Sequence, residues 1–420
     1  MPASWQLVPL KYICSGFVKD GPHETPKFTD DGIPFLSVDG IQDNKLVFNG
    51  CRYISEEDHV RYSMKCHPKQ GDVLLGKAAS VGKVAYVDSN MDFNVWSPLA
   101  VITAKSNKYG KYIYYCLQSS MLQAQCEVFA NSNTQKNLGM NTIDNLDMPL
   151  PSEHEADVIT NFLDHETAKI DTLIEKQQQL IKLLKEKRQA VISHAVTKGL
   201  NPQAPMKNSG VEWLGEVPEH WVVTRAKYVS NIFVPQRNKP ELNDTQGVAW
   251  ATMEDMKQQY ISDTSKYVSS QSALAAGSKT LKAGSVIASC VGNFGITSIN
   301  KVDVIINQQL QAFQPFNIKA EYLQSIVALS KQYFELIGTA ATLVYVNQEG
   351  FENLPVLVPP EKEQNDICAY VLEKSTSFDL LIEKSVIQTS LLKERRTALI
   401  SAAVTGKIDV RDFDGVSNDA

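Results

Sequence analysis

The sequence has few cysteines and no motif that would join them. Seven cysteines are scattered over 420 residues, their number is odd, and no C-x-x-C pair occurs. This usage suits a reducing cytosol better than a disulfide framework. The amino terminus, MPASWQLVPLKYICSG, has neither a charged segment nor a long apolar run, and nowhere do eighteen apolar residues follow one another. We therefore expect a soluble, cytoplasmic protein.

The sequence also lacks the motifs on which several kinds of catalysis depend. It has no Asn-Pro-Pro, which a base-flipping adenine methyltransferase would need, and no G-x-x-x-x-G-K-[ST] phosphate loop. His154-Glu155 has no second histidine four positions on, so it fits the first turn of a helix better. Cys51, Cys66 and His67 lack a fourth ligand at zinc-site spacing, which favours buried or incidental thiols. We expect no catalytic residue, no metal site and no cofactor in this chain.

What the sequence does contain is a duplication. Residues 183–199 read LLKEKRQAVISHAVTKG and residues 391–407 read LLKERRTALISAAVTGK, with eleven identities 208 positions apart. The same offset relates Glu155 to Glu363. Further upstream it drifts to 216, where Trp5 with Lys11-Tyr12 matches Trp221 with Lys227-Tyr228. The chain is therefore two copies of one unit of about 200 residues, with loops of different length.

Each copy divides into a mixed front and a helical back. The fronts, 1–150 and 206–355, carry short β-rich runs such as 71–75 and 83–87, turns rich in Gly, Asn and Ser, and helical stretches such as 321–337. The backs, 151–205 and 356–420, are each predicted to hold one long helix, over 152–198 and 361–405, with a linker or tail after it.

Local signals mark where these helices begin and end. Ser152-x-x-Glu155 is a capping box, and Gly199 and Gly406 stand where helices commonly stop. Apolar residues recur close to a heptad spacing along both helices. They are residues 170, 173, 174, 180, 181, 184, 191 and 195, and in the second copy Phe378, Leu381, Ile382, Leu392, Leu399 and Ala403.

These features predict an α+β protein with internal duplication. Two mixed α/β domains are separated by two long helices that form a coiled-coil spacer. If an approximate twofold axis relates the copies, the helices run antiparallel, with one domain at each end of a shared rod. From periodicity alone, a coiled-coil scaffold with two incidental domains remains an alternative.

The combination of elements resembles the specificity subunit of type I restriction-modification systems. It comprises the W-x-x-x-x-x-K-Y opening, the N-L and P-P/S-x-x-E turn, the LIEK and LLKEKR helix used twice, and SGVEWLGEVPEHW at 209–221. The resemblance implies a non-catalytic, DNA-binding subunit whose fronts are target-recognition domains, each reading one half of a split sequence. It also implies that the helices set the gap and dock two modification subunits, which methylate adenine with S-adenosylmethionine, and that restriction subunits join to cleave DNA.

Neither front is basic, which is unusual for a stand-alone DNA-binding domain. Residues 1–150 hold 14 Lys and Arg against 15 Asp and Glu, and residues 206–355 hold 12 against 13. DNA binding therefore requires local patches or phosphate neutralisation shared with partner subunits. A duplicated structural adaptor without sequence-specific DNA binding is the alternative function.

Polar loops supply the candidate DNA-binding residues. Asn and Gln can pair with adenine edges, and Arg or Lys with guanine O6 and N7, although solvated loops would have the same composition. The candidates in the first front are Lys19, His23, Lys27, Lys77, Ser80, Lys83, Asn131, Asn133, Gln135 and Lys136. Those in the second are Arg237, Asn238, Lys239, Ser289, Asn293, Gln308 and Gln309. For the helices, the expected spacer and docking residues are Leu173, Ile174, Leu184, Arg188, Leu381, Ile382, Leu392 and Arg396.

Overall fold

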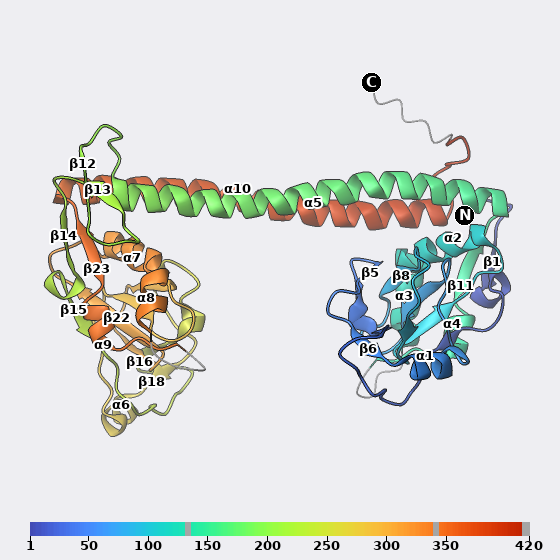
Figure 1. The fold of residues 1–420 in the computed structure, drawn as a ribbon, viewed down its shortest axis with the longest axis horizontal. Coiled ribbons are helices and arrows are strands. Elements are labelled where there is room, and N and C mark those ends of the chain that lie inside the picture. The colour runs from blue at the N-terminus through green and yellow to red at the C-terminus, as the bar shows by residue number, and fades with distance from the viewer. Residues whose placement is uncertain (131–135, 339–343, 414–420) are drawn as a thin grey trace. The chain divides into compact units, whose positions relative to one another are not determined.

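The structure is a computed structural model that describes residues 1–130, 136–338 and 344–413 (Figure 1). The chain separates into two compact units. Unit 1 comprises Met1–Gln179 and Ser385–Ala420, and unit 2 comprises Leu180–Lys384. Each unit therefore contains one front domain and half of each long helix. Among the described helices, none has both the length and the apolar character required to cross a bilayer.

The domain of unit 1 is built from short strands and short helices. The strands are β1 Gln6–Pro9, β2 Lys19–Asp20, β3 Ile33–Leu36, β4 Ile41–Gln42, β5 Lys45–Leu46, β6 Arg52–Ile54, β7 Val73–Gly76, β8 Val84–Tyr86, β9 Asn94–Val95, β10 Leu99–Ile102 and β11 Asp147–Leu150. The helices are η1 Leu10–Ile13, η2 Val38–Gly40, α1 Glu56–Ser63, α2 Asn107–Gln118, α3 Ser120–Phe129 and α4 Met140–Asp144.

An antiparallel four-stranded sheet, in the order β2-β10-β7-β8, forms the centre of this domain. Strands β7, β8 and β10 are apolar on both faces because each face meets a core. Val73 and Leu75 of β7 belong to the core shared with α2 and α3, whereas Leu74 belongs to a second core with β9. Successive side chains of a strand point to opposite faces, so one short apolar run supplies both layers. The sheet β6-β3-β9 and the pairs β1-β11 and β4-β5 complete the domain.

Unit 2 repeats this plan with small differences. Its strands are β12 Met206–Asn208, β13 Glu216–Pro218, β14 Val222–Arg225, β15 Ser230–Phe233, β16 Val248–Ala251, β17 Tyr260–Ile261, β18 Tyr267–Val268, β19 Val286–Ser289, β20 Thr297–Asn300, β21 Val304–Ile306, β22 Leu310–Pro315 and β23 Pro355–Val358. Its short helices are η3 Ala226–Tyr228, η4 Met253–Asp255, α6 Ser270–Ala276, α7 Ala320–Leu329, α8 Lys331–Ile337 and α9 Gln348–Glu352.

The two main sheets of unit 2 have the same strand order as those of unit 1. The central order β15-β22-β19-β20 corresponds to β2-β10-β7-β8, and β18-β16-β21 corresponds to β6-β3-β9. Strand β17 adds a fifth, parallel neighbour next to β20. The helical stretch predicted over 321–337 is two helices instead of one. Ser330, which donates its hydroxyl to the Ile326 carbonyl at 2.8 Å, separates α7 from α8.

The two long helices are α5 Glu153–Lys198 and α10 Glu361–Val404. The predicted capping box is confirmed. The Glu155 N–H donates to Ser152 Oγ at 3.3 Å, and the Ser152 N–H donates to Glu155 Oε2 at 3.1 Å. Gly199 at φ +78° and Gly406 at φ +65° follow the helix ends in the left-handed conformation that glycine adopts without strain.

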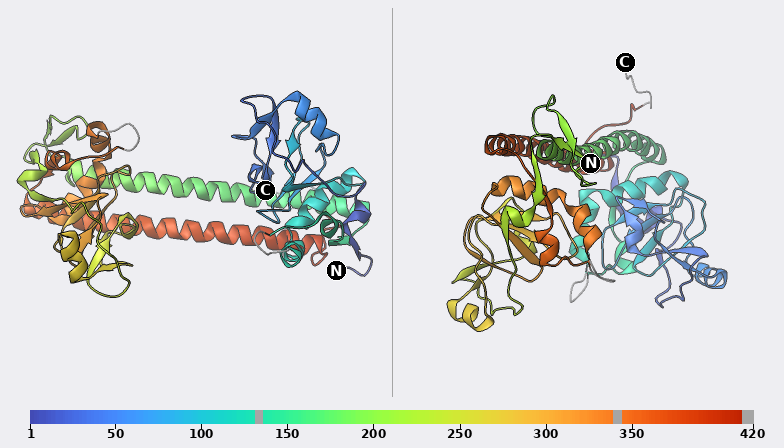
Figure 2. Two further views of the ribbon diagram at one scale, coloured as in Figure 1. Left: turned by 90° about the horizontal axis from the view of Figure 1, so that it is seen from below. Right: turned by 60° about the vertical axis from the view of Figure 1, so that its left-hand side comes forward.

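Within each unit the halves of α5 and α10 run antiparallel (Figures 1 and 2). In unit 1, Arg396 Nε donates to Asp171 Oδ1 at 2.9 Å, and Ile170, Ile174 and Leu392 form a small apolar cluster. In unit 2, Arg188 Nη2 lies 3.3 Å from Asp379 Oδ2. Asp379 is the copy of Asp171 and Arg396 is the copy of Arg188, so each ion pair joins one copy to the other.

The predicted apolar stripe is only partly correct. Leu173 and its copy Leu381 are 48% and 47% exposed, whereas Ile174, one position further on, is buried. The helix pair is narrow, so it covers a thin strip of each helix. The neighbouring leucines therefore stay on the surface.

A recurring set of contacts fixes each front domain to the helices. The indole N–H of Trp5 donates to Glu155 Oε1 at 3.3 Å, and that of Trp221 donates to Glu363 Oε2 at 2.9 Å. These bonds tie each domain to the start of its own helix. The hydroxyls of two buried tyrosines then tie each domain to the end of the other copy's helix. Tyr112 donates to the Val404 carbonyl at 3.2 Å, and Tyr322 donates to the Val196 carbonyl at 2.8 Å.

Candidate nucleic-acid interface

In unit 1, backbone hydrogen bonds bring three of the predicted loops together. The Ser97 N–H donates to the Pro22 carbonyl at 3.2 Å, which links the loop after β2 to the start of β10. The Lys77 N–H donates to the Pro98 carbonyl at 2.8 Å, which adds the turn between β7 and β8. The Leu138 N–H donates to the Lys77 carbonyl at 2.7 Å, which adds the segment before α4. Residues 19–27, 77–83 and 136–138 therefore meet at one end of the sheet.

Unit 2 repeats these bonds at equivalent positions. The Cys290 N–H donates to the Gln309 carbonyl at 2.9 Å, and the Val346 N–H donates to the Cys290 carbonyl at 3.0 Å. Gln308 Nε2 donates to the Arg237 carbonyl at 2.8 Å, so a side chain makes the link that Ser97 makes in unit 1. The predicted groups at 237–239, 289–293 and 308–309 thus lie together. We call this surface, with its counterpart in unit 1, the three-loop surface.

In unit 1, Lys19, His23, Lys27 and Lys136 are exposed on this surface, and Ser80 is half-buried. Lys136 pairs with Glu127. Two other predicted lysines point inward. Lys77 is 8% exposed and pairs with Asp20 at 3.2 Å, and Lys83 donates to the Ile41 carbonyl at 3.1 Å. Asn131, Asn133 and Gln135 lie outside the described residues.

Asp20 fixes the loop that carries His23. Its carboxylate contacts Lys65 at 2.7 Å, Lys77 at 3.2 Å and His23 Nε2 at 3.1 Å. Burial opposes ionisation of Asp20, but the hydrogen bonds from Lys65 and Lys77 outweigh it and hold its pKa below the ordinary value. The charge of Lys77 is therefore neutralised by Asp20 inside the domain. The exposed positive charge beside His23 comes instead from Lys19 and Lys27.

In unit 2 all but one of the predicted residues are exposed to solvent. Arg237, Asn238, Lys239, Asn293, Gln308 and Gln309 are all exposed. Ser289 is buried, and its hydroxyl donates to the Val291 carbonyl at 3.0 Å, which fixes the turn that carries Asn293. This surface holds two cations and four amides, which are the side chains that can pair with guanine and adenine edges.

Tyr345, which was not among the residues predicted from the sequence, is 40% exposed and belongs to the same surface. It forms an isolated β-bridge with Val291 in the turn that carries Asn293. Burial raises the pKa of its hydroxyl, so the group stays neutral and can donate or accept. The offset of 208 places Tyr345 on Asn137, at the end of the polar loop predicted in the first copy. The alignment of the two copies was therefore the sequence signal that could have identified Tyr345.

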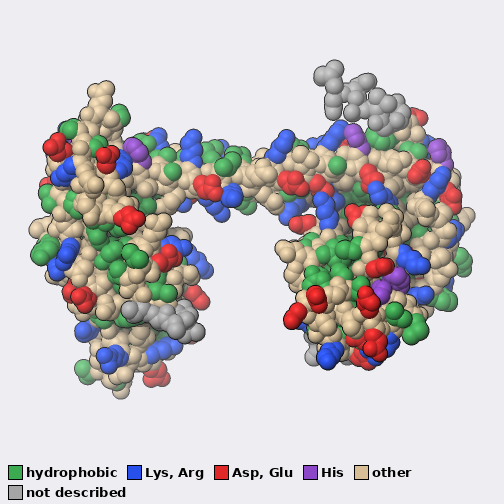
Figure 3. Space-filling view, in the orientation of Figure 1, with side chains coloured by type: hydrophobic (Ala, Val, Ile, Leu, Met, Phe, Trp, Pro, Cys, Tyr) green, Lys and Arg blue, Asp and Glu red, His purple; other side chains and the backbone are tan. Residues whose placement is uncertain are grey.

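Charge on the domain surfaces is mixed. On the face shown in Figure 3, lysine and arginine alternate with aspartate and glutamate over both units, without a continuous basic area. This agrees with the near balance of charges counted in the sequence. Local positions such as Arg237 and Lys239 therefore matter more than the overall field.

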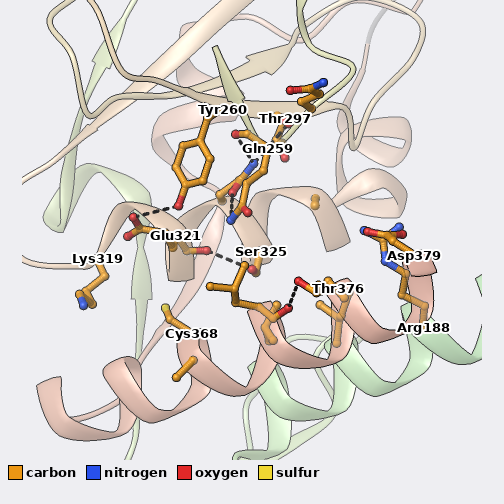
Figure 4. Close-up of a pocket in the computed structure, with 18 of the residues that line it drawn as sticks. Arg188, Gln259, Tyr260, Thr297, Lys319, Glu321, Ser325, Cys368, Thr376 and Asp379 are labelled. Atoms are coloured by element: carbon orange, nitrogen blue, oxygen red, sulfur yellow. Dashed lines mark hydrogen bonds and ion pairs between the residues drawn. The ribbon is translucent and has the colours of Figure 1, made fainter. Parts of the chain in front are cut away.

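Unit 2 also contains a cleft of about 790 Å³ between its domain and its helix halves (Figure 4). The hydroxyl of Tyr260 donates to Glu321 Oε1 at 3.4 Å on one wall. The hydroxyls of Ser325 and Thr376 donate to carbonyls of their own helices. Burial raises the pKa of the Cys368 thiol to about 11, so this cysteine is not a nucleophile at neutral pH. The lining mixes hydroxyls, amides and aliphatic carbon with charged residues of both signs, which are Arg188, Lys257, Lys319, Glu321 and Asp379.

The predicted spacer and docking residues divide into three groups by burial. Ile174 and Leu392 are buried between the helices, whereas Leu184, Ile382, Arg188 and Arg396 are half-buried. Leu173 and Leu381 are exposed, as are Leu183 at 60% and its copy Leu391 at 52%. The two copies thus present the same two leucines on the surface.

Comparison with known proteins agrees with the duplicated fold. The family model described as type I restriction modification DNA specificity domain matches residues 2–183 and 218–387. The chain belongs to this family. The resemblance noted in the sequence is therefore confirmed, and the two matched segments coincide with the two copies.

Individual relatives of the specificity-domain family are distant in sequence. The MjaIX type I restriction enzyme specificity subunit of Methanocaldococcus jannaschii is 21% identical over 98% of this chain and 95% of its own length. The EcoKI specificity subunit of Escherichia coli K12 is 20% identical over 55% of this chain and 48% of its own. A chain solved in a study of assembly and conformational transition of the type I R-M system shares the fold. Its TM-score is 0.67, at 17% identity over 97% of this chain and 99% of that one.

Proposed function

We propose that this chain is the DNA-specificity subunit of a type I restriction-modification complex, and that each three-loop surface reads one half of a bipartite target. The observation that carries the proposal is that the two units share one backbone arrangement but differ in the side chains exposed on it. Hydrogen bonds at equivalent positions join the loops in both units, one of them through the Gln308 side chain in unit 2, yet the exposed residues at these positions differ. A structural repeat needs no such divergence, whereas two readers of unlike half-sites require it.

Chemistry on the two surfaces supports different half-sites. Unit 1 offers Lys19, His23, Lys27 and Lys136, and unit 2 offers Arg237, Lys239 and exposed amides. A cation pairs best with guanine, and an Asn or Gln amide pairs best with adenine. We expect the half-site of unit 2 to include at least one base pair read by Arg237 and one read by an amide.

The nearly neutral domains support shared binding of DNA. A protein that neutralises few phosphates gains little from counterion release, so its own affinity for DNA is modest. We propose that two modification subunits supply the remaining phosphate contacts, carry S-adenosylmethionine and perform methylation. In this assignment the chain itself is not catalytic, and restriction subunits join the same complex to cleave DNA.

The duplicated leucines support two equivalent docking sites on the helices. Leu173 and Leu381 occupy the same place in the repeat, as do Leu183 and Leu391, and all four are exposed. Two equivalent protein contacts would require apolar residues to be exposed at matched positions in the repeat, as these are. Two such sites suit two copies of one modification subunit.

Reconstitution tests the proposal. The chain is combined with the modification subunit of its host and S-adenosylmethionine, and methyl transfer to random-sequence duplex DNA is followed by sequencing. We expect methylation at one split motif with the complex and no incorporation of labelled methyl groups with the chain alone. Methylation by the isolated chain would refute the non-catalytic assignment. Methylation without a shared motif would favour a structural adaptor.

A further inference from the structure

The domain of unit 1 brings two histidines and a carboxylate together outside the three-loop surface. His59 lies on α1, His67 follows that helix, and Asp92 lies in the loop between β8 and β9. One possible ligand atom from each residue lies within 4.8 Å of the others. His67 Nε2 is 3.1 Å from Asp92 Oδ1, and the His59 and His67 rings are 5.4 Å apart between centroids.

A buried amide orients one of these ligands. Asn94 is 1% exposed, and its Nδ2 donates to Ser63 Oγ at 3.2 Å, so its oxygen faces the other way. That oxygen, Oδ1, lies 2.6 Å from His59 Nδ1. Nδ1 of His59 therefore carries the proton and Nε2 keeps its lone pair. Histidines that bind metals are commonly fixed in this manner, with the second ring nitrogen bonded to an oxygen acceptor.

We infer that His59, His67 and Asp92 form a binding site for a divalent transition metal of the Zn²⁺ type. Two imidazoles and one carboxylate are a ligand set that Zn²⁺ accepts, with water in the fourth position. Bonds of about 2.0–2.1 Å in tetrahedral geometry separate neighbouring ligands by roughly 3.3 Å. The His67–Asp92 distance already meets this value. The ligand atom of His59 lies within 4.8 Å of the other two, so it has to move closer when the metal binds.

This set of ligands differs from the cysteine-containing set considered from the sequence alone. His67 was considered there with Cys51 and Cys66, but Cys66 is buried, and its thiol has a pKa raised to about 12 by burial. The other two ligands are instead His59 on α1, eight residues before His67, and Asp92, in the loop between β8 and β9. Spacing rules for cysteine-rich zinc sites do not detect such a set.

A metal here would hold α1 from one side. On its other side, Arg61 pairs with Glu24 at 3.0 Å and the Tyr62 hydroxyl donates to the same carboxylate at 2.9 Å. Lys65, after the helix, pairs with Asp20. The site would therefore stabilise the helix that supports the loop with His23, independently of whether that loop reads DNA.

Titration with Co²⁺ tests the inference on the full-length protein. We expect one equivalent to bind with the visible absorption of a four-coordinate nitrogen and oxygen site, to be displaced by Zn²⁺ and to be unaffected by Mg²⁺. His59→Gln and His67→Gln should each abolish it. His194→Gln, which alters an exposed histidine on α5, should leave it unchanged.

Asn94 provides a graded test. Asn94→Ala keeps all three ligands but frees the His59 ring, and we expect affinity for Co²⁺ to fall at least about tenfold. Zn²⁺ should also raise the thermal unfolding temperature of the wild type and of His194→Gln, but not that of His59→Gln or His67→Gln. Absence of the equivalent in the wild type, or its persistence in both of these glutamine variants, would overturn the inference.

Discussion

Among single residues, Asp20 shows how a buried charge fixes a surface loop. Lys77 is nearly buried, and its ion pair with Asp20 satisfies it. Removing one partner of such a pair leaves an uncompensated charge, which costs more than the pair itself contributes. Asp20→Asn should therefore destabilise the domain of unit 1 by about 3 kcal/mol at neutral pH.

The pKa of Asp20 gives this prediction a pH dependence. Because the folded-state pKa is lowered, the stabilisation is complete above the unfolded value of roughly 4 and is lost as pH falls through the folded value. The difference in unfolding free energy between wild type and Asp20→Asn should be large at pH 7 and shrink below about pH 4. A difference that is equal at pH 7 and pH 3 would contradict the assignment.

Arg237 provides the residue test of base reading in unit 2. It is exposed, and Gln308 holds its backbone in place. Arg237→Ala should weaken binding of the reconstituted complex to its target by about 1–3 kcal/mol and relax specificity at one base pair. Lys282→Ala is the matched control because Lys282 precedes the opposite end of β19, and its ion pair with Asp303 is on the surface. Equal losses on target and unrelated duplexes would assign Arg237 to phosphate contact alone.

Among the secondary-structure elements, the long helices pair in the same antiparallel manner within each unit. Asp171 pairs with Arg396 and Arg188 with Asp379, and the two residue numbers add up to 567 in both pairs. On each helix the two ion-pairing residues are 17 positions apart, Asp171 to Arg188 on α5 and Asp379 to Arg396 on α10. Equal insertions between these residues, one on each helix, preserve both ion pairs.

We therefore predict that four residues inserted after Lys182 and four inserted before Ser385 lengthen both helices by about 6 Å and turn them by about 40°. Each domain keeps its loops, so the half-sites should stay the same. The unread gap should grow by about one or two base pairs, since DNA advances roughly 3.4 Å per base pair. Methylome sequencing of cells with the variant measures the gap. The same insertion in α5 alone breaks one ion pair and should impair assembly.

Predictions from the sequence were most accurate where the signal involves residues close together in the chain. The capping box of Ser152 and Glu155 and the terminal glycines at 199 and 406 were readable because the bonds they make span a few residues. Leu173 and Ile174 show the limit, since a heptad pattern does not say which of two adjacent residues faces a narrow partner. The pairing of Lys77 with Asp20 joins residues 57 positions apart, and nothing in the sequence near either one indicates it.

For the whole molecule, each unit is assembled from both copies. Tyr112 of the first copy binds the end of α10, and Tyr322 of the second binds the end of α5. Duplication makes this exchange possible within one chain, because the ends of the two helices are nearly identical in sequence. The domains can then diverge on their outer loops while the residues that contact the helices stay alike. The proposal that each domain reads its own half-site rests on this difference between the shared contacts to the helices and the divergent outer loops.

Exchange of one domain tests that account most directly. Residues 6–150, from the start of β1 to the end of β11, are replaced by the equivalent segment of another family member, and cells that supply the modification subunit are analysed by methylome sequencing. The account predicts that one half of the methylated motif changes, while the other half and the gap stay the same. A change in both halves, or a motif that does not change at all, would contradict it.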